Sequence, residues 1–281
     1  MIDTHVHVVS QELERFPLRP GCSTDADAWF RASPYTASGF NALMSASGVS
    51  GALFVQAFSA YGTDNRFVVA SGNEPFGRWA STVYVDISEP DWKVTLHDWV
   101  EQGATGIRIV PDYSASKHEL DDPVVLEAVR FATDLNLGIV FTMRRGQGSH
   151  LAPILERFPD AVLALDHCGY PDVSGGYPFE YADPLFQLAR YPGVHLKVST
   201  LVLEDVVKAN EDTRKFVNRL AEAFGPSRLM WGSNFSASND RSYDELVEFG
   251  RFAFSDLSES DRESGLEDGP LRLWPAIGRH S

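Results

Sequence analysis

Short runs of apolar residues recur along the whole chain, separated by longer and more polar stretches. Most of these runs are aliphatic or β-branched throughout and do not alternate between apolar and polar positions. This pattern is typical of strands that are buried on both faces, as in a parallel sheet. The predicted strands cover residues 2–7, 52–56, 82–87, 106–110, 138–143, 162–167, 194–199 and 229–234.

Between these runs, apolar residues recur at the three- and four-residue spacing of amphipathic helices. The clearest predicted helices cover residues 92–101, 123–135, 212–224 and 242–254. Eight strands that alternate with helices predict an α/β fold, a (β/α)8 TIM barrel that residues 1–281 form as a single domain. A doubly wound open sheet is the competing fold.

Two segments fall outside this alternation. Residues 10–34 are the longest irregular stretch, and a loop of that length in a compact domain is usually functional. We therefore expect it to be an active-site loop that covers the site and excludes water. Residues 257–277 are expected to form a closing helix whose apolar side chains pack against the barrel.

Histidines follow the first and sixth predicted strands, where a parallel barrel carries its chemistry. His5 and His7 are two residues apart on one strand, so both face the same side and could hold one metal ion or one polarised group. His167 is a candidate third member of this group. Asp166 alternates with His167 and is expected to point away, as a structural carboxylate.

Other polar residues at strand ends are candidates for contacts with a substrate. Guanidinium groups suit carboxylate recognition, and hydroxyl and amide side chains suit polar ligands. The candidate substrate-binding residues are Ser59, Tyr61, Asn65, Arg108, Thr142, Arg144 and Arg145. Asn234, at the end of the eighth strand, is expected at the barrel mouth, and Lys197 is a further candidate for a buried charge.

Charge and cysteine content narrow the choice of partner. The chain has 24 Lys and Arg against 39 Asp and Glu, a net charge of −15, which argues against binding to nucleic acid or to an acidic membrane surface. Two cysteines make no disulfide framework. We find no signal peptide and no apolar run of membrane-spanning length. We expect a cytoplasmic protein that acts on a small molecule.

Several motifs occur in a characteristic order: HVH at 5–7, GTDN at 62–65, GIR at 106–108, DHCG at 166–169 and WGSN at 231–234. With them, the chain resembles the amidohydrolase superfamily, in its amidohydrolase 2 branch, and in particular the 2-pyrone-4,6-dicarboxylate lactonases and the sugar-acid lactonases. The resemblance implies a distorted TIM barrel and hydrolysis of a cyclic ester. It also implies catalytic roles for His5, His7 and His167, the last polarising the substrate carbonyl.

The chain departs from this family at three places. Position 234 is Asn where the family has an Asp that activates water, so Asn234 is either an inactivating substitution or a sign of another base or reaction. Thr142 stands near a position where tightly zinc-binding members have His. The resemblance therefore implies either no metal or one divalent ion, most simply zinc, on His5, His7 and His167. The apolar residues 201–203 replace an arginine of the lactonases, which argues against the pyrone dicarboxylate itself.

The leading hypothesis is a hydrolase that opens a lactone of a small anionic or polyoxygenated substrate by water attack at the carbonyl. The histidines would stabilise the oxyanion, and the arginines would orient the substrate. One alternative is a non-oxidative decarboxylase or another carbon–carbon bond enzyme of the same branch. Another is a binding protein that kept the barrel and lost the catalytic Asp.

Overall fold

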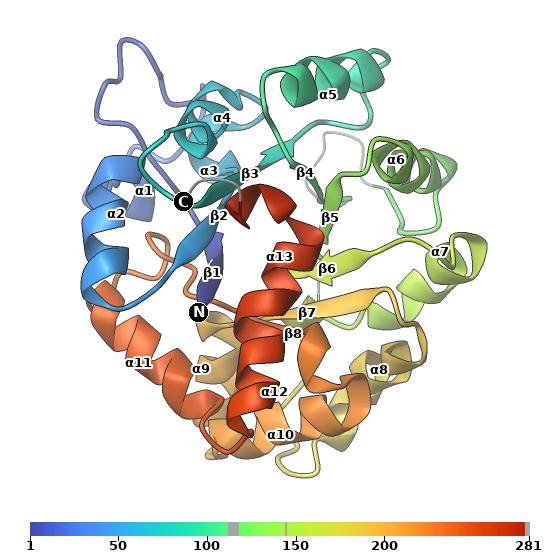
Figure 1. The fold of residues 1–281 in the computed structure, drawn as a ribbon. Helices are drawn as coiled ribbons and strands as arrows, with labels where there is room; N and C mark the ends of the chain where they lie inside the picture. Colours follow the sequence, from blue (N-terminus) through green and yellow to red (C-terminus); the bar gives the residue numbers. More distant parts are fainter. Residues whose placement is uncertain (112–117, 144, 279–281) are drawn as a thin grey trace.

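Eight parallel strands form one sheet that follows the order of the chain. The computed structural model describes residues 1–111, 118–143 and 145–278. Neighbouring strands pair in parallel all the way from the first to the eighth (Figure 1). The strands are β1 (Ile2–Val6), β2 (Gly51–Val55), β3 (Trp79–Tyr84), β4 (Gly106–Ile109), β5 (Gly138–Phe141), β6 (Leu163–Leu165), β7 (Val194–Ser199) and β8 (Leu229–Gly232).

Helices surround this sheet, so the molecule is a TIM barrel, as the sequence predicts, and not an open doubly wound sheet. The helices are α1 (Trp29–Ala32), α2 (Ala37–Ala46), α3 (Phe58–Tyr61), α4 (Arg66–Gly72), α5 (Trp92–Glu101), α6 (Pro123–Asp134), α7 (Ala152–Arg157), α8 (Asp183–Phe186), α9 (Thr200–Lys208), α10 (Thr213–Phe224), α11 (Tyr243–Ala253), α12 (Glu259–Glu263) and α13 (Gly269–Leu273). None of the helices in the described residues is both long enough and apolar enough to cross a membrane.

The barrel closes between β1 and β8 through an irregular seam. Val6 pairs with Phe235, beyond the end of β8, in an isolated parallel bridge. The backbone N–H of His7 donates to the Phe235 carbonyl at 2.6 Å, and that of Asn234 donates to the His5 carbonyl at 2.9 Å. The seam therefore fixes the segment that contains Asn234 directly beside the two histidines of β1.

Strand bounds agree with the sequence prediction to within one residue, except at the third strand and at the fifth, sixth and eighth strands, which end two residues earlier than predicted. The predicted strand 82–87 lies three residues too late, because β3 is Trp79–Tyr84. The chain turns after β3: the backbone N–H of Ser88 donates to the Asp86 carboxylate at 3.0 Å, and that of Glu89 donates to the Asp86 carbonyl at 3.1 Å. Apolar Val85 and Ile87 are buried there as loop residues, which explains why their pattern resembles a strand.

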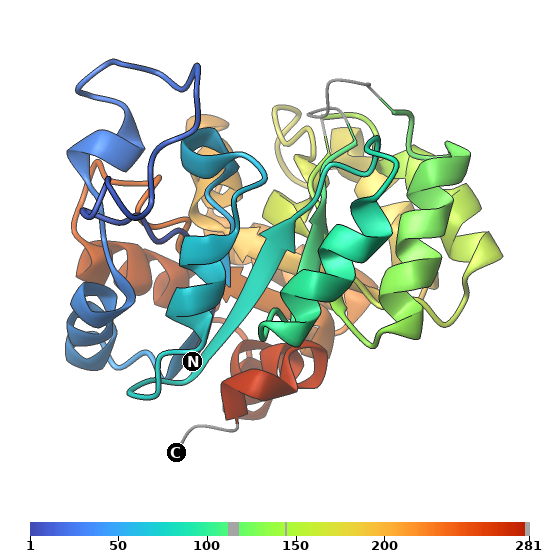
Figure 2. The ribbon, with the colours of Figure 1, turned by 90° about the horizontal axis from the view of Figure 1, so that it is seen from above.

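The C-terminal helices cover the end of the barrel that lies opposite the 10–34 loop (Figure 2). Trp274 is fully buried there and packs with barrel residues of a small apolar cluster. Gly138 makes room for its indole, because a Cβ at that position would lie 2.1 Å from the Trp274 Nε1. The expectation that the terminal apolar residues serve packing is confirmed.

Candidate active site

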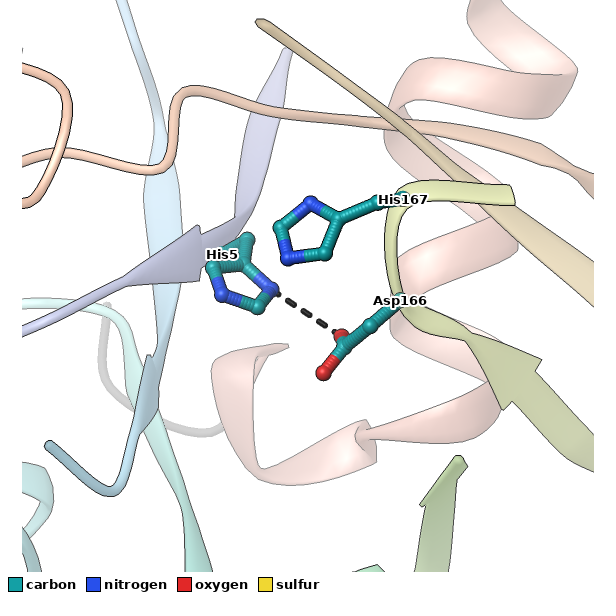
Figure 3. Close-up of side chains that lie close together, drawn as sticks. All are labelled: His5, Asp166 and His167. Atoms are coloured by element: carbon teal, nitrogen blue, oxygen red, sulfur yellow. Dashed lines mark hydrogen bonds and ion pairs between the residues drawn. The ribbon is translucent and has the colours of Figure 1, made fainter. Parts of the chain in front are cut away.

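The chain ends β6 with a left-handed turn that carries two of the candidate residues. Residues Asp166–Gly169 form a short 3-10 turn, η2, in which His167 and Cys168 have φ of 54° and 53°. Such values are rare outside glycine and end the alternation of side chains at Leu165. As a result, Asp166 and His167 both face His5 (Figure 3). The expectation that Asp166 points away from the site is wrong, because its strand ends one residue before it.

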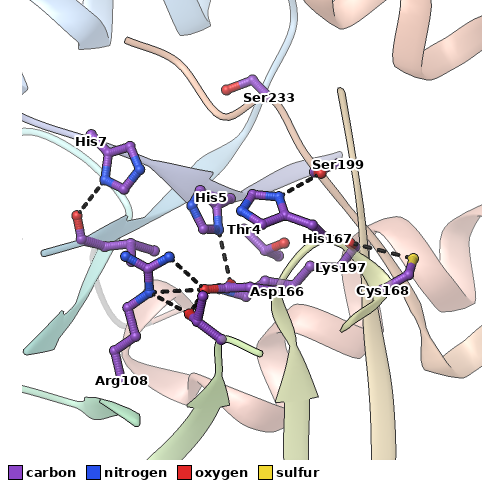
Figure 4. Close-up of polar contacts among 12 residues, drawn as sticks. Thr4, His5, His7, Arg108, Asp166, His167, Cys168, Lys197, Ser199 and Ser233 are labelled. Atoms are coloured by element: carbon purple, nitrogen blue, oxygen red, sulfur yellow. Dashed lines mark hydrogen bonds and ion pairs between the residues drawn. The ribbon is translucent and has the colours of Figure 1, made fainter. Parts of the chain in front are cut away.

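Asp166 is the centre of the buried polar network (Figure 4). Its Oδ1 lies 3.0 Å from the Nδ1 of His5 and 3.1 Å from the Nζ of Lys197. Its Oδ2 accepts from Arg108, at 2.9 Å from Nε and 2.8 Å from Nη2, and from the Thr142 hydroxyl at 2.7 Å. Burial alone would raise the pKa of Asp166, but Lys197, then His5 and Arg108, hold that pKa well below its usual range. Asp166 is therefore an ionised acceptor that is surrounded by donors.

Each of the three candidate histidines uses its Nδ1 for a partner inside the protein. His5 bonds Asp166, the Nδ1 of His7 donates to the Val55 carbonyl at 2.9 Å, and the Nδ1 of His167 lies 2.7 Å from the Ser199 hydroxyl. The ring centroids of His7 and His167 lie 5.0 and 4.7 Å from that of His5. This arrangement leaves the three Nε2 atoms as the ring nitrogens for a ligand.

Burial keeps these histidines neutral at neutral pH. Desolvation is the main cause that lowers the pKa of His7 to about 3 and that of His167 to about 4. Desolvation also lowers the pKa of His5 well below its usual value, although Asp166 opposes it. Since all three are uncharged near pH 7, each presents a lone pair on one ring nitrogen.

Asn234 lies beside the histidines, at a buried position with a left-handed backbone of φ 59°. Its side-chain NH2 donates to the Ser238 hydroxyl at 3.0 Å. An amide positions polar groups but takes no proton near neutral pH, so the chain's proton acceptor is a different group.

Three of the predicted substrate-binding residues hydrogen-bond to the protein itself, although the Nη1 of Arg108 has no partner among the described residues. Arg108 and Thr142 bond each other at 2.9 Å and both bond Asp166. The Asn65 amide bonds backbone atoms of Tyr84 and Thr63. These side chains therefore build the walls of the site and hold its charges in place.

The other predicted residues that the structure describes are Ser59, Tyr61 and Arg145. Tyr61 accepts a 2.8 Å bond from the Ser10 backbone and lines a cavity of about 540 Å³, which Arg19 also lines. The Ser59 carbonyl accepts from the side chain of Arg19. Half-exposed Arg145 pairs with Asp205 at 3.0 Å and lines a second cavity of about 250 Å³. Arg144 lies outside the described residues.

The long loop meets the site through α1. The ring of Trp29 lies 5.2 Å from that of His7, and Arg19 contacts the loop after β2. These contacts place α1 beside His7 and the segment around Arg19 beside the loop after β2.

Two further residues belong to the site. Ser199 was absent from the sequence-based candidates, although it follows Lys197 at the two-residue spacing that turns both to one side of β7. Phe58 packs beneath the Arg108 guanidinium, whose central carbon lies 4.9 Å from the ring centroid. The aromatic contact has no sequence signal, because it depends on how the loop after β2 folds back.

Three of the site residues lie close enough together to bind one metal ion. Ligand atoms of His5, Asp166 and His167 all lie within 4.8 Å of one another, whereas the sequence-based set had His7 in place of Asp166. The Nε2 of His5 is buried and has no hydrogen-bond partner among the described residues. Imidazole and carboxylate donors suit Zn²⁺. An ion at this position would be held by His5 and His167 and would share Asp166 with its cationic partners.

Comparisons with known proteins agree with this fold. L-fucono-1,5-lactonase from Burkholderia ambifaria is 27% identical over 207 residues, which cover 70% of this chain and 68% of that protein. A putative 2-pyrone-4,6-dicarboxylic acid hydrolase from Pseudomonas putida shares the fold with a TM-score of 0.75 and 21% identity, over 98% of this chain and 97% of that one. An amidohydrolase from Burkholderia multivorans with bound zinc shares the fold with a TM-score of 0.72 and 22% identity, over 98% of each chain.

The family assignment rests on the sequence itself. The model of the family described as amidohydrolase, in its second branch, matches residues 2–276 and thus includes every strand of the barrel and all of the site residues. The chain therefore belongs to the amidohydrolase family.

Proposed function

We propose that this protein is a hydrolase that opens a lactone of a small, polyoxygenated substrate by attack of water at the carbonyl carbon. The observation that carries the proposal is the set of three buried, neutral imidazoles, each anchored through Nδ1 and each with Nε2 left for a ligand. Family membership and the lactonase among its relatives support the same reaction class.

The hydrogen-bond partners of His5 and His167 allow the two imidazoles to carry their protons on different ring nitrogens. Because Asp166 is an ionised acceptor, the Nδ1 of His5 carries the proton and its Nε2 carries a lone pair. The Nδ1 of His167 faces a hydroxyl, which is able to donate as well as accept. When Ser199 donates, the proton of His167 is on Nε2. His5 is then suited to accept a proton and His167 to donate a hydrogen bond.

These states support a two-step hydrolysis. The water oxygen bonds to the lactone carbonyl carbon as its proton passes to the Nε2 of His5. The Nε2–H of His167 stabilises the oxyanion, and the ring C–O bond then breaks as His5 returns the proton to the leaving alkoxide. Asn234 orients the water. A Zn²⁺ ion, when bound by His5 and His167, would supply Lewis-acid polarisation of the carbonyl.

Charge balance at the site favours a substrate with few negative charges. Arg108 and Lys197 both pair with Asp166, and Arg145 pairs with Asp205. Arg108 and Lys197 share one carboxylate, so this buried group carries one net positive charge, which balances at most one substrate carboxylate. A substrate rich in hydroxyl groups suits this site better than a dicarboxylate, which needs free cations.

A lactone panel tests the proposal, with the protein as given and with Asn234→Asp. We expect both to hydrolyse sugar-acid lactones, with kcat higher in Asn234→Asp by up to about 100-fold, since a carboxylate base is added to the imidazole base. Asn210→Asp is the matched control: Asn210 has nearly the same φ, 58°, on the exposed surface away from the site. No hydrolysis by either form overturns the proposal, and ligand binding without turnover in both would instead favour a binding protein.

A further inference from the structure

Lys197 is a buried cation that no substrate-binding role explains. Its side chain is 0% exposed, on β7 in the interior of the barrel. The Nζ lies 3.1 Å from the Oδ1 of Asp166 and 5.3 Å from the ring centroid of Trp274, on the side away from the histidines. A buried ammonium loses several kcal/mol of hydration, and a buried ion pair is weak evidence for stability. Its presence therefore calls for a role other than holding the fold.

That role follows from the two oxygens of Asp166. Arg108 and Thr142 both donate to Oδ2, which leaves Oδ1 for Lys197 and His5. The Nζ of Lys197 pairs with Oδ1 by charge and has no hydrogen-bond partner among the described residues. Without the ammonium, Oδ1 would keep His5 as its remaining polar partner there. The carboxylate would then be free to rotate toward the Arg108 guanidinium and away from the imidazole.

We propose that Lys197 is a positioning residue: its ammonium holds the Oδ1 of Asp166 against His5, so that His5 carries its proton on Nδ1 and presents an unprotonated Nε2 to the substrate. The tautomer decides the chemistry, because a His5 protonated on Nε2 has no lone pair there for a proton or another ligand. The expected change in kcat rests on the proposed function, whereas the expected tautomer of His5 does not.

The test combines Lys197→Met with ¹⁵N NMR of histidine-labelled protein. In the unchanged protein we expect His5 to show a protonated Nδ1 and an unprotonated Nε2. In Lys197→Met we expect a mixture of the two tautomers and a fall in kcat of about 10–100-fold, the usual effect of losing a partner that orients a functional imidazole. We expect KM to change less than about threefold, since Lys197 touches no substrate.

Lys208→Met is the matched control. Lys208 also pairs with an aspartate oxygen at 3.1 Å, that of Asp205, but its side chain is 70% exposed. The same substitution there should change neither the His5 signals nor kcat. If Lys208→Met and Lys197→Met give the same result, the proposal is overturned.

A double variant separates positioning from a purely structural role. If Lys197 acts through Asp166, adding Lys197→Met to Asp166→Asn should leave the His5 signals of Asp166→Asn unchanged. An additional change would overturn the proposal, as would an unchanged His5 tautomer in Lys197→Met alone. A Lys197→Met protein that does not fold would assign the ammonium to folding and also overturn it. If no lactone is hydrolysed, the NMR result still decides the tautomer, so the two failures are distinguishable.

Discussion

At the scale of single residues, one ionised carboxylate determines how its neighbours behave. Asp166 is approached by two cations, one hydroxyl and one imidazole, and each of them is able to donate. Protonation of Asp166 would remove its charge pairing with both Arg108 and Lys197. The carboxylate therefore stays ionised and holds the His5 proton on Nδ1. This tautomer does not require a carboxylate at position 234.

His195 provides a residue-scale prediction about stability. It lies on β7 and is 8% exposed, and its Nδ1 has no partner among the described residues. Burial, then the charges of Arg228 and Arg272, lower the pKa of His195 to about 4. The unfolded chain binds this proton near pH 6.5, so the group's contribution to stability is complete above pH 6.5 and is lost as pH falls toward 4.

We expect His195→Gln to remove this part of the pH dependence. Between pH 7 and pH 4, the free energy of unfolding of the unchanged protein should fall by about 3 kcal/mol more than that of the variant, from about 1.4 kcal/mol for each pKa unit. Urea unfolding at several pH values measures both curves. Curves that stay parallel over this range would contradict the expected shift.

At the scale of elements, periodicity predicted the strands and helices but failed where the backbone leaves the extended conformation. The two-residue spacing of His5 and His7 holds, because both follow the course of β1 and its seam with β8. It fails at Asp166, because β6 ends at Leu165 and η2 begins with Asp166, followed by left-handed His167 and Cys168. Glycine is the usual sequence signal for a left-handed conformation, and neither His167 nor Cys168 is a glycine. The sequence alone therefore could not show that Asp166 is the centre of the site.

The η2 turn predicts a difference between the two thiols. Cys168 is 1% exposed and donates toward the Lys197 carbonyl at 3.6 Å, and burial raises the pKa of its thiol. Cys22 is partly exposed in the 10–34 loop. Because the thiolate is the reactive form, we expect iodoacetamide to modify Cys22 in the folded protein and Cys168 only after unfolding.

Mass spectrometry of tryptic peptides measures both rates, and protein labelled in denaturant provides the control. Modification of Cys168 at the rate of Cys22 in the folded state would mean that η2 opens readily. The turn that holds His167 would then be less rigid than its contacts indicate.

At the scale of the whole molecule, the two ends of the barrel have separate tasks. The 10–34 loop, the seam between β1 and β8, and the η2 turn lie around the candidate active site at one end. The C-terminal segment closes the other end, where Trp274 packs with residues such as Ile2 and Val140. The barrel prediction and the residues at the strand ends located the candidate site. The closure of the other end depends on glycines far from Trp274 in the sequence, which only the fold brings together.

Trp274→Ala tests this division of tasks. The indole is fully buried and fills the space left by Gly138 and Gly106, so its loss opens a cavity in the barrel floor. We expect the free energy of unfolding to fall by about 3–5 kcal/mol, as for other buried Trp→Ala changes. Partly buried Trp99 provides a control in which the same substitution should cost less.

Activity should respond differently from stability in Trp274→Ala. Lys197 loses its contact with the indole but keeps Asp166, so we expect kcat to fall less than in Lys197→Met and KM to stay unchanged. Urea unfolding and steady-state kinetics on the same preparations give both quantities. A loss of kcat equal to that of Lys197→Met, with little loss of stability, would show that the floor of the barrel takes part in positioning Asp166 and that the two ends do not act separately.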